Sequence, residues 1–321
     1  MTGHEMKTRP RVVFMGSGEI GLPTLRWLAG SSRVDLMAVV TQPDKPVGRS
    51  QVVSPPVPKK IAIELGLPVL QPTRVRRPEE LDRIAELAPD LIVVMAYGQI
   101  LPKRLLDMPT LACLNLHASL LPRHRGAAPI QASILAGDQV TGLTVMYMAE
   151  GLDTGDILLT KSIPIRHRET GGSLHDRLAL LGPHAVGTAI EQILSNSAPR
   201  IPQDESEATY APKLDRESGR IDWTKDCWYY DRLIRAMNPW PGAYALVNDS
   251  HAAAKKFKIH RALPVHRLSG EPGRITAVRN RGIEVACGLG GLLLLDVQLE
   301  GKRAMPAAEF QRGFHLPPGF H

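Results

Sequence analysis

The chain is poor in cysteine and aromatic residues and has no long apolar run. Only three of its 321 residues are cysteines, and these lie far apart at Cys113, Cys227 and Cys287, with no Cys-x-x-Cys pair. The sequence therefore indicates neither a disulfide framework nor a cysteine zinc site, and we expect reduced, mostly buried thiols. No apolar run reaches the ~18 residues that span a bilayer, and residues 1–10 lack the apolar core of a secretion signal. These absences predict a cytoplasmic protein that has no membrane partner.

The charge is basic and is concentrated toward the C-terminal end. The formal net charge is +7. Residues 217–321 hold 15 Lys and Arg against 10 Asp and Glu, whereas residues 1–216 hold 24 against 22. A basic surface attracts anionic partners such as nucleic acids, although charge alone does not identify one. We therefore expect such a partner to bind the C-terminal third.

The order of apolar segments predicts two domains of different architecture. Five strand-like runs alternate with amphipathic helical segments, at residues 11–16, 34–41, 90–98, 113–119 and 141–148. This alternation is typical of an α/β fold with a Rossmann-like, doubly wound and mostly parallel sheet, which we assign to residues 1–197. Residues 198–216 are polar and proline-containing, and we interpret them as a linker. Short strands separated by turn residues follow in 217–321 and predict a small OB-like β-barrel domain.

The first strand runs into Gly16-Ser17-Gly18-Glu19-Ile20-Gly21, which has the Gly-x-Gly-x-x-Gly spacing of a dinucleotide-binding loop. Such a loop works with an acidic residue at the end of the second strand that holds the ribose. The nearest candidate, Asp44, follows Pro43 in a proline-rich loop. We therefore favour a tight strand-to-helix turn, or an anion contact at the helix N-terminus, over dinucleotide binding. A dinucleotide-dependent oxidoreductase remains an alternative.

Polar side chains of three types gather at the ends of two predicted strands. Asn115 and His117 alternate along one strand end, so their side chains lie on the same face. Asp153 and Asp156 lie in a glycine-bracketed loop after a later strand. An amide, an imidazole and a carboxylate at one sheet edge suit acyl transfer to an amine, because two groups can stabilise an oxyanion while the third handles protons. The same residues are also typical of a polar strand end and an Asp turn, so spacing alone leaves both interpretations open.

These segments resemble a known family. "NLHASLLPRHRGAAPIQ" and "GLTVMYMAEGLDTGDIL" are similar to the core of the folate-dependent formyltransferases. "TQPDKPVGR", "VMAYGQILP", "RIDW" and "IRAMNPWPG", in that order, are similar to the bacterial branch of the family that formylates methionyl-tRNA. The resemblance covers nearly the whole chain beyond the first ten residues.

The resemblance implies a cytoplasmic transferase that moves the formyl group of 10-formyltetrahydrofolate, its co-substrate, to the α-amine of methionine on initiator tRNA without a metal. Asn115, His117 and Asp153 would be the catalytic residues. The amide and the imidazole would stabilise the oxyanion, and the carboxylate would orient the ring and move protons through water. We expect a monomer, because no interface pattern is visible.

The resemblance also implies binding residues in both parts of the chain. The folate site would be lined by residues of two loops, namely Tyr97, Gly98, Ile100, Ser119, Leu120, Leu121 and Pro122. The tRNA would meet basic residues of an early loop and of the second domain, namely Lys45, Arg49, Lys255, Lys256 and Lys258. The last three belong to "KKFKIHR", in which we expect charge to alternate onto one strand face. We expect the aromatic residues of "DWTKDCWYY" and "NPWPG" to pack in the core and between the domains rather than to stack on bases.

Two positions depart from the family pattern. The family usually has Gly-Thr-Pro and an aromatic residue in the first loop, where this chain has Gly16 to Ile20, and it usually has an aromatic residue where this chain has His124. The first departure concerns the pocket for the methionyl side chain. Rival functions are a formyltransferase acting on a nucleotide-linked amino sugar or on glycinamide ribotide, and a non-enzymatic RNA-binding module.

Overall fold

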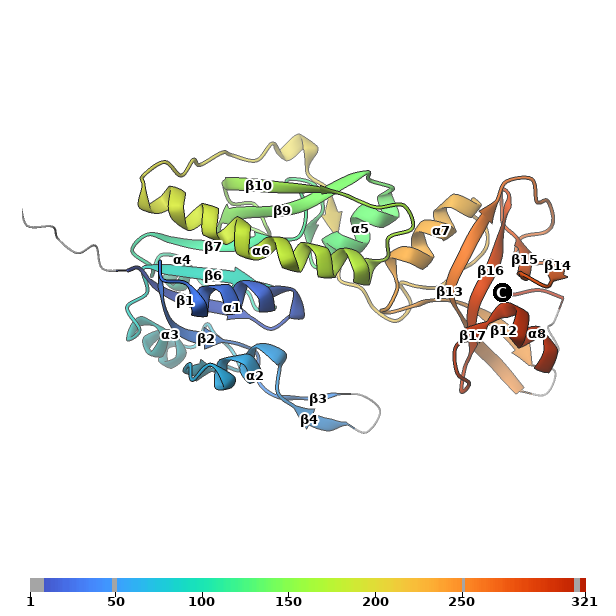
Figure 1. Cartoon of the computed structure of the whole chain (residues 1–321), viewed down its shortest axis with the longest axis horizontal. Helices are drawn as coiled ribbons and strands as arrows, with labels where there is room; N and C mark the ends of the chain where they lie inside the picture. Colours follow the sequence, from blue (N-terminus) through green and yellow to red (C-terminus); the bar gives the residue numbers. More distant parts are fainter. Residues whose placement is uncertain (1–8, 48–50, 250–251, 315–317) are drawn as a thin grey trace, which may run out of the picture. The chain divides into compact units, whose positions relative to one another are not determined.

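A computed structural model describes residues 9–47, 51–249, 252–314 and 318–321. The chain forms two compact units, each assembled from separate stretches of the sequence (Figure 1). The first unit comprises 1–126, 140–163 and 175–210, and the second comprises 127–139, 164–174 and 211–321.

A seven-stranded sheet forms the centre of the first unit, in the order β10-β9-β7-β6-β1-β2-β5. Its strands are β1 (Arg11–Gly16), β2 (Asp35–Val40), β5 (Val69–Leu70), β6 (Leu91–Met95), β7 (Ala112–His117), β9 (Val140–Tyr147) and β10 (Ile157–Pro164). β1 pairs in parallel with β2 and β6, and β6 with β7, whereas β9 is antiparallel to β7. The expected Rossmann-like, mostly parallel sheet is therefore confirmed.

Helices and short turns connect these strands. They are η1 (Glu19–Gly21), α1 (Leu22–Gly30), α2 (Val57–Glu64), α3 (Pro78–Ala85), α4 (Lys103–Leu106), α6 (Gly171–Leu194) and η2 (Glu205–Glu207), together with the hairpin of β3 (Lys45–Val47) and β4 (Val52–Ser54). α1 and α6 lie side by side (Figure 1). A Cβ at Gly182 of α6 would lie 2.3 Å from Thr24 Oγ1 of α1. This glycine therefore permits the close approach of the two helices.

The central strands are buried on both faces, which explains their nearly continuous apolar sequences. Residues 12–15 of β1 are 0% exposed, and all five residues of β6 are buried. Since β1, β6 and β7 are parallel, the loops that follow them meet at one edge of the sheet.

Antiparallel strands form the second unit, in the order β12-β13-β16-β15-β14, with β17 paired to β16. Its elements are α5 (Pro129–Ala136), α7 (Cys227–Ala236), β12 (Ala243–Asp249), β13 (Ala252–Val265), β14 (Ile275–Arg279), β15 (Gly282–Ala286), β16 (Gly291–Leu299), β17 (Met305–Pro306) and α8 (Ala307–Gly313). The expected domain of antiparallel strands after the α/β sheet is confirmed.

Aromatic rings make up part of the core of the second unit. The ring of Phe257 lies 5.3 Å from that of Phe310 and 4.9 Å from that of Phe320, between centroids. Trp223 and Tyr230 are each 1% exposed, as expected for packing residues. The same expectation is wrong for Trp228 and Trp240, which are 43% and 55% exposed.

The three cysteines are buried free thiols, as the sequence predicts. Burial raises the pKa of Cys113 and of Cys287 to about 12, so both thiols are protonated at neutral pH. Within the described ranges, no helix has the length and apolar character needed to cross a membrane.

Gly142 on β9 provides a test of the sheet geometry. A Cβ there would lie 2.1 Å from the carbonyl oxygen of Lys161 on β10. We expect Gly142→Ala to lower the free energy of unfolding by about 1–3 kcal/mol through overpacking, as measured by urea denaturation. Gly30→Ala is the matched control, because a Cβ at Gly30 would have no atom of the described residues within 4 Å, and it should stay within about 0.5 kcal/mol of wild type. Equal losses in both variants would contradict this geometry.

Candidate active site

Asn115, His117 and Asp153 converge at the edge where the parallel strands end. Asn115 and His117 are two residues apart on β7, and Asp153 lies in the loop between β9 and β10. Asn115 Nδ2 lies 3.5 Å from Asp153 Oδ1, and His117 Nδ1 lies 3.6 Å from Oδ2. The backbone N–H of Gly126 donates to Oδ2 at 2.8 Å. An amide, an imidazole and a carboxylate are therefore close enough to act on one reacting group.

The hydrogen bond made by Nε2 shows which ring nitrogen of His117 carries a hydrogen. Nε2 lies 2.9 Å from the carbonyl oxygen of His124, and because a carbonyl only accepts, Nε2 is the donor. Nδ1 faces Asp153 and carries a hydrogen only when the ring is doubly protonated. A carboxylate 3.6 Å away stabilises that cation. His117 therefore has one ring nitrogen bound to a backbone carbonyl and the other directed at the Asp153 carboxylate.

A buried guanidinium lies next to this cluster in the sequence. Arg125 belongs to β8 (Arg125–Gly126), which pairs with β11 (Tyr210–Ala211), and its side chain is 0% exposed. Its Nη1 and Nη2 donate to the two carboxylate oxygens of Glu205, each at 2.8 Å. Its Nε and Nη2 donate to Gln203 Oε1 at 3.0 and 2.8 Å. These contacts are needed because a buried charge without partners is strongly destabilising.

Gln203 also reaches the Asp153 loop. Its Nε2 donates to the carbonyl oxygens of Asp153 and Gly155, each at 2.8 Å. Sequence reasoning missed Gln203 and Glu205, because it treated residues 198–216 as a linker. The one available signal was Arg125 at the end of the basic run Arg123-His124-Arg125, which would need a carboxylate partner if buried, but the sequence does not show where that partner lies.

The expected folate-lining residues differ in exposure. Ser119 is buried, and its Oγ donates to the carbonyl oxygen of Arg123 at 2.6 Å. Leu121 is buried, whereas Leu120 and Pro122 are half-buried.

The loop after β6 supplies the other expected folate residues. Tyr97 is 2% exposed, and burial raises the pKa of its hydroxyl. The carbonyl oxygen of Tyr97 accepts from Gln42 Nε2 at 3.1 Å. Gly98 has a φ of +79°, a conformation that favours glycine, and Ile100 is 88% exposed. Of Tyr97, Gly98 and Ile100, Ile100 therefore has the side chain that is most available to a ligand.

Ile100 lines a cavity of about 310 Å³ together with Arg74, Arg76 and Gln99. Gln99 Oε1 accepts from the N–H of Val75 at 2.8 Å, which fixes one side of the cavity. Both arginines are exposed, and neither forms an ion pair with any residue that the structure describes. Two guanidinium groups beside an apolar side chain suit a ligand with carboxylates. Sequence reasoning missed both arginines, because "TRVRR" reads as ordinary solvated charge.

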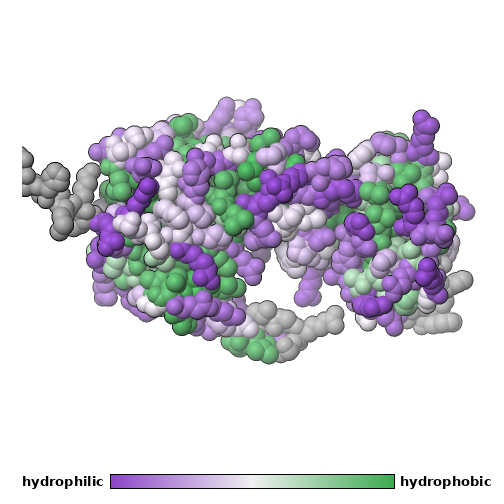
Figure 2. All heavy atoms as spheres, in the orientation of Figure 1, coloured by the Kyte–Doolittle hydropathy of each residue, from purple (hydrophilic) through white to green (hydrophobic). Residues whose placement is uncertain are grey.

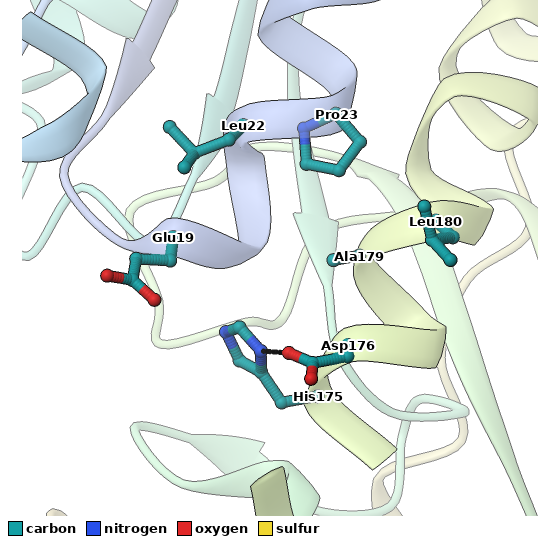
Figure 3. Close-up of a pocket in the computed structure, with 7 residues that line it drawn as sticks. All are labelled: Glu19, Leu22, Pro23, His175, Asp176, Ala179 and Leu180. Carbon is teal, nitrogen blue, oxygen red and sulfur yellow. Dashed lines mark hydrogen bonds and ion pairs between the residues drawn. The ribbon is translucent and has the colours of Figure 1, made fainter. Parts of the chain in front are cut away.

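A second cavity, of about 330 Å³, lies between the start of α1 and α6 (Figure 3). Its lining is partly apolar and partly charged, and consists of Glu19, Leu22, Pro23, His175, Asp176, Ala179 and Leu180. His175 Nδ1 lies 3.0 Å from Asp176 Oδ1, as the dashed line in Figure 3 marks. Because η1 follows β1, this cavity borders the same sheet edge as the catalytic cluster.

The glycine loop after β1 uses its N–H groups within the protein. The N–H groups of Ser17 and Gly18 donate to the carbonyl oxygen of Ala96 at 3.1 and 3.3 Å. A Cβ at Gly16 would lie 2.8 Å from the carbonyl oxygen of Met95. These glycines therefore allow a tight turn against the β6 loop, which supports the preference for a structural turn over a pyrophosphate-binding loop.

The hairpin of β3 and β4 carries the early-loop residues expected to meet RNA. Lys45 is exposed and contacts Gln42 Oε1, whereas Arg49 lies outside the described residues. Val52 and Val53 on β4 are 59% and 62% exposed and form an apolar patch visible in Figure 2. The hairpin therefore presents both a cation and an apolar surface.

The lysines of β13 do not form the single stripe that we expected. Lys256 and Lys258 share one face, because they alternate with the buried Phe257. Lys255 lies on the opposite face, the one that carries Phe257. This corrects the expectation that all three lysines share one strand face. Lys256 Nζ is 3.0 Å from Glu217 Oε1 and 4.0 Å from the ring centroid of Tyr244.

Comparison with known proteins identifies the family. A family profile described as formyl transferase matches residues 11–190, and one described as formyl transferase, C-terminal domain, matches residues 213–315. The chain belongs to the formyl transferase family. The methionyl-tRNA formyltransferase of Geobacter sulfurreducens is 47% identical to this formyl transferase over 309 residues, 96% of this chain and 95% of the relative. The methionyl-tRNA formyltransferase of Akkermansia muciniphila is 47% identical over 304 residues, 94% of this chain and 96% of the relative.

Solved structures share the fold of this formyl transferase. HypX from Aquifex aeolicus in complex with tetrahydrofolic acid has a TM-score of 0.63 and 20% identity, over 97% of this chain and 49% of the HypX chain. This chain thus spans about half the length of HypX. The N-formyltransferase from Helicobacter canadensis in complex with folinic acid and dTDP-3-aminofucose has a TM-score of 0.64 and 16% identity, over 89% of this chain and 98% of that one.

The ion pair between Arg125 and Glu205 predicts a pH-dependent contribution to stability. The hydrogen bond from Arg125 lowers the pKa of Glu205 below its ordinary value. The contribution is therefore complete above the ordinary Glu pKa of about 4.3 and is lost as the pH falls through the lower folded-state pKa. We expect Glu205→Gln to have a lower Tm than wild type at pH 7, and the difference to shrink at pH 3. The same difference at both pH values would contradict the ion pair.

Proposed function

We propose that this chain transfers the formyl group of 10-formyltetrahydrofolate to the α-amine of methionine on initiator methionyl-tRNA. The observation that carries the proposal is the convergence of Asn115 and His117 on the Asp153 carboxylate at the sheet edge. The 47% identity to methionyl-tRNA formyltransferases over nearly the whole chain supports methionyl-tRNA as the acceptor.

Asn115 and His117 stabilise the charge that develops on the formyl oxygen as the amine attacks. Asn115 contributes its Nδ2–H, and His117 contributes an Nδ1–H when both ring nitrogens carry a hydrogen, while Nε2–H stays bound to the carbonyl of His124. One such donor is worth about 3 kcal/mol of transition-state stabilisation. The folate supplies the activated formyl group when it is bound. The chain needs no nucleophile of its own, because the attacking amine is the nucleophile.

Asp153 lies beside the His117 ring and transfers a proton from the attacking amine to the leaving nitrogen. The amine must lose a proton when its nitrogen bonds to the formyl carbon, and the folate nitrogen must gain one when its bond to that carbon breaks. The Asp153 carboxylate accepts the first proton, directly or through water, and can deliver it to the leaving nitrogen. The N–H of Gly126 keeps Oδ2 in place during both transfers.

The folate is proposed to lie along the loops after β6 and β7. The exposed Ile100 offers an apolar contact, and Arg74 and Arg76 provide positive charge at the same cavity. The glutamate portion of a folate carries carboxylates, which guanidinium groups bind well. The buried residues of the same loops would form the wall behind the bound folate. These are Tyr97, Ser119 and Leu121.

The tRNA is proposed to contact both the β3–β4 hairpin and the second unit. Lys45 and the exposed valines of β4 are available on the hairpin. In the second unit, Lys258 lies beside Gly242, because its Nζ is 3.7 Å from the point where a Cβ on that glycine would be. Trp240, two residues before Gly242, is exposed. The lysine can meet a phosphate, and the exposed indole can stack on a base.

The direct test is a formylation assay with two acceptors. The protein is incubated with 10-formyltetrahydrofolate and either methionyl initiator tRNA or methionyl elongator tRNA, and formylmethionine is detected by mass spectrometry after deacylation. We expect the product from the initiator tRNA and much less from the elongator. Absence of formylmethionine from both tRNAs, with a folate-consuming reaction on another amine, would replace the proposal by a different acceptor.

Asp153→Asn is expected to keep the fold and to lower kcat at least about 100-fold. Its amide cannot take the proton of the amine and does not stabilise the imidazolium, whereas it can still accept from the N–H of Gly126. Circular dichroism checks the fold, and the formylation assay measures kcat. A variant with near-normal kcat would remove Asp153 from the mechanism.

Replacing both cavity arginines should weaken the folate site. We expect Arg74→Ala with Arg76→Ala to raise the KM for 10-formyltetrahydrofolate about tenfold, because charge-assisted contacts are lost, and to leave the KM for tRNA nearly unchanged. Arg77→Ala is the matched control, because Arg77 faces Glu79 at 3.9 Å and does not line the cavity. An equal effect in the control would show a general charge effect instead of a folate contact.

A further inference from the structure

Residues 201–209 contact two loops beside the catalytic cluster. One is the Asp153 loop between β9 and β10, and the other is the loop that runs from the end of β7 to β8. Ile201 forms a β-bridge with Ile157 at the end of the Asp153 loop. Thr209 receives hydrogen bonds from the other loop, since its Oγ1 accepts from the N–H of His124 and its carbonyl oxygen accepts from the N–H of Arg125, each at 2.8 Å. The stretch that looks like a linker in the sequence is therefore attached to the site on both sides.

Gln203 is the side chain that joins the two loops directly. Its Oε1 accepts two hydrogen bonds from the Arg125 guanidinium, at 3.0 and 2.8 Å. Its Nε2 donates two, at 2.8 Å, to the carbonyl oxygens of Asp153 and Gly155. One amide thus uses its full capacity of two accepted and two donated hydrogen bonds.

These contacts close a ring around the Asp153 carboxylate. Asp153 Oδ2 accepts from the N–H of Gly126, Gly126 follows Arg125 in the chain, Arg125 binds Gln203, and Gln203 returns to the carbonyl oxygen of Asp153. Asp153 has a φ of +53°, a conformation that non-glycine residues adopt only when their surroundings hold them there. This closed set of contacts therefore fixes the position of the Asp153 carboxylate relative to the imidazole of His117.

We propose that Gln203 is a positioning residue for the reaction, and that it acts by holding the Asp153 carboxylate beside His117, where it can take up the proton of the attacking amine. The inference rests on the proposed function of the site. A displacement of about 1 Å at a catalytic group can cost about 100-fold in rate, so a residue that never touches substrate can control turnover.

The amide group makes a sharp substitution available. Gln203→Glu keeps the size of the side chain and an acceptor for Arg125, but it replaces the Nε2 donor with a carboxylate oxygen that faces two carbonyl oxygens. Glu205→Gln is the matched control, because it perturbs the same guanidinium without touching the Asp153 loop. The two variants therefore separate the support of Arg125 from the support of Asp153.

We expect Gln203→Glu to lower kcat for formylation about 10- to 100-fold, with the KM of each substrate changed less than about threefold. We expect Glu205→Gln to lower the Tm but to leave kcat within about threefold of wild type. A Gln203→Glu variant with the kcat of the Glu205→Gln control would overturn the inference while wild-type activity still supports the proposed function. If Gln203→Glu does not fold by circular dichroism, Gln203→Asn takes its place, since its shorter side chain cannot span both loops.

Two further measurements show whether Gln203 acts through Asp153. In an Asp153→Asn background, Gln203→Glu should lower kcat less than about twofold further, whereas multiplied losses would mean an independent role and reject the inference. Amide hydrogen exchange in residues 150–157 should be faster in Gln203→Glu than in Glu205→Gln, and unchanged exchange would also reject it. The exchange result does not depend on the formylation assay, so it tests the inference even if the acceptor proves to be a different amine.

Discussion

The buried charge of Arg125 is the constraint on which the site depends. A guanidinium that is 0% exposed needs partners within the protein, and it finds them in Glu205 and Gln203. Satisfying this charge brings a segment from 78 to 80 residues further along the chain against the loop that follows β7. Once there, Gln203 has donors left over for the Asp153 loop, so one electrostatic requirement organises both sides of the candidate active site.

The parallel sheet supplies the other half of the arrangement. β1, β6 and β7 end at one edge of the sheet. This brings together three segments that are distant in the sequence, namely the glycine turn, the loop with Ile100, and the strand end with Asn115 and His117. The polar groups of these loops are largely used to hold one another, as with the glycine-turn N–H groups bound to Ala96. Among the described residues, the catalytic cluster, the cavity with Arg74 and Arg76 and the cavity between the start of α1 and α6 stay available for a ligand.

The chemistry also explains the residue types at the site. Acyl transfer to an amine uses the amine as nucleophile, so donors for an oxygen and a group that moves protons are sufficient. His117 meets this need with one ring nitrogen bound to a backbone carbonyl and the other beside a carboxylate. The second unit contributes no group to this step in our proposal. We propose that it binds a polyanion, through groups such as Lys258 and Trp240.

The mostly parallel sheet and the strand position of Asn115 and His117 could be predicted from the residues alone, because both follow from local rules: apolar runs mark buried strands, and alternation assigns side chains to faces. The sequence also indicated the loop that carries Asp153. The folded chain was needed to find that Glu205 neutralises Arg125 and Gln203 supports the Asp153 loop, that Trp240 is exposed, and that Lys255 faces away from Lys256 and Lys258. These features depend on which distant segments meet in the folded chain, and composition carries no information about such partners. A polar, proline-containing stretch therefore reads as a linker until the buried charge it neutralises is known.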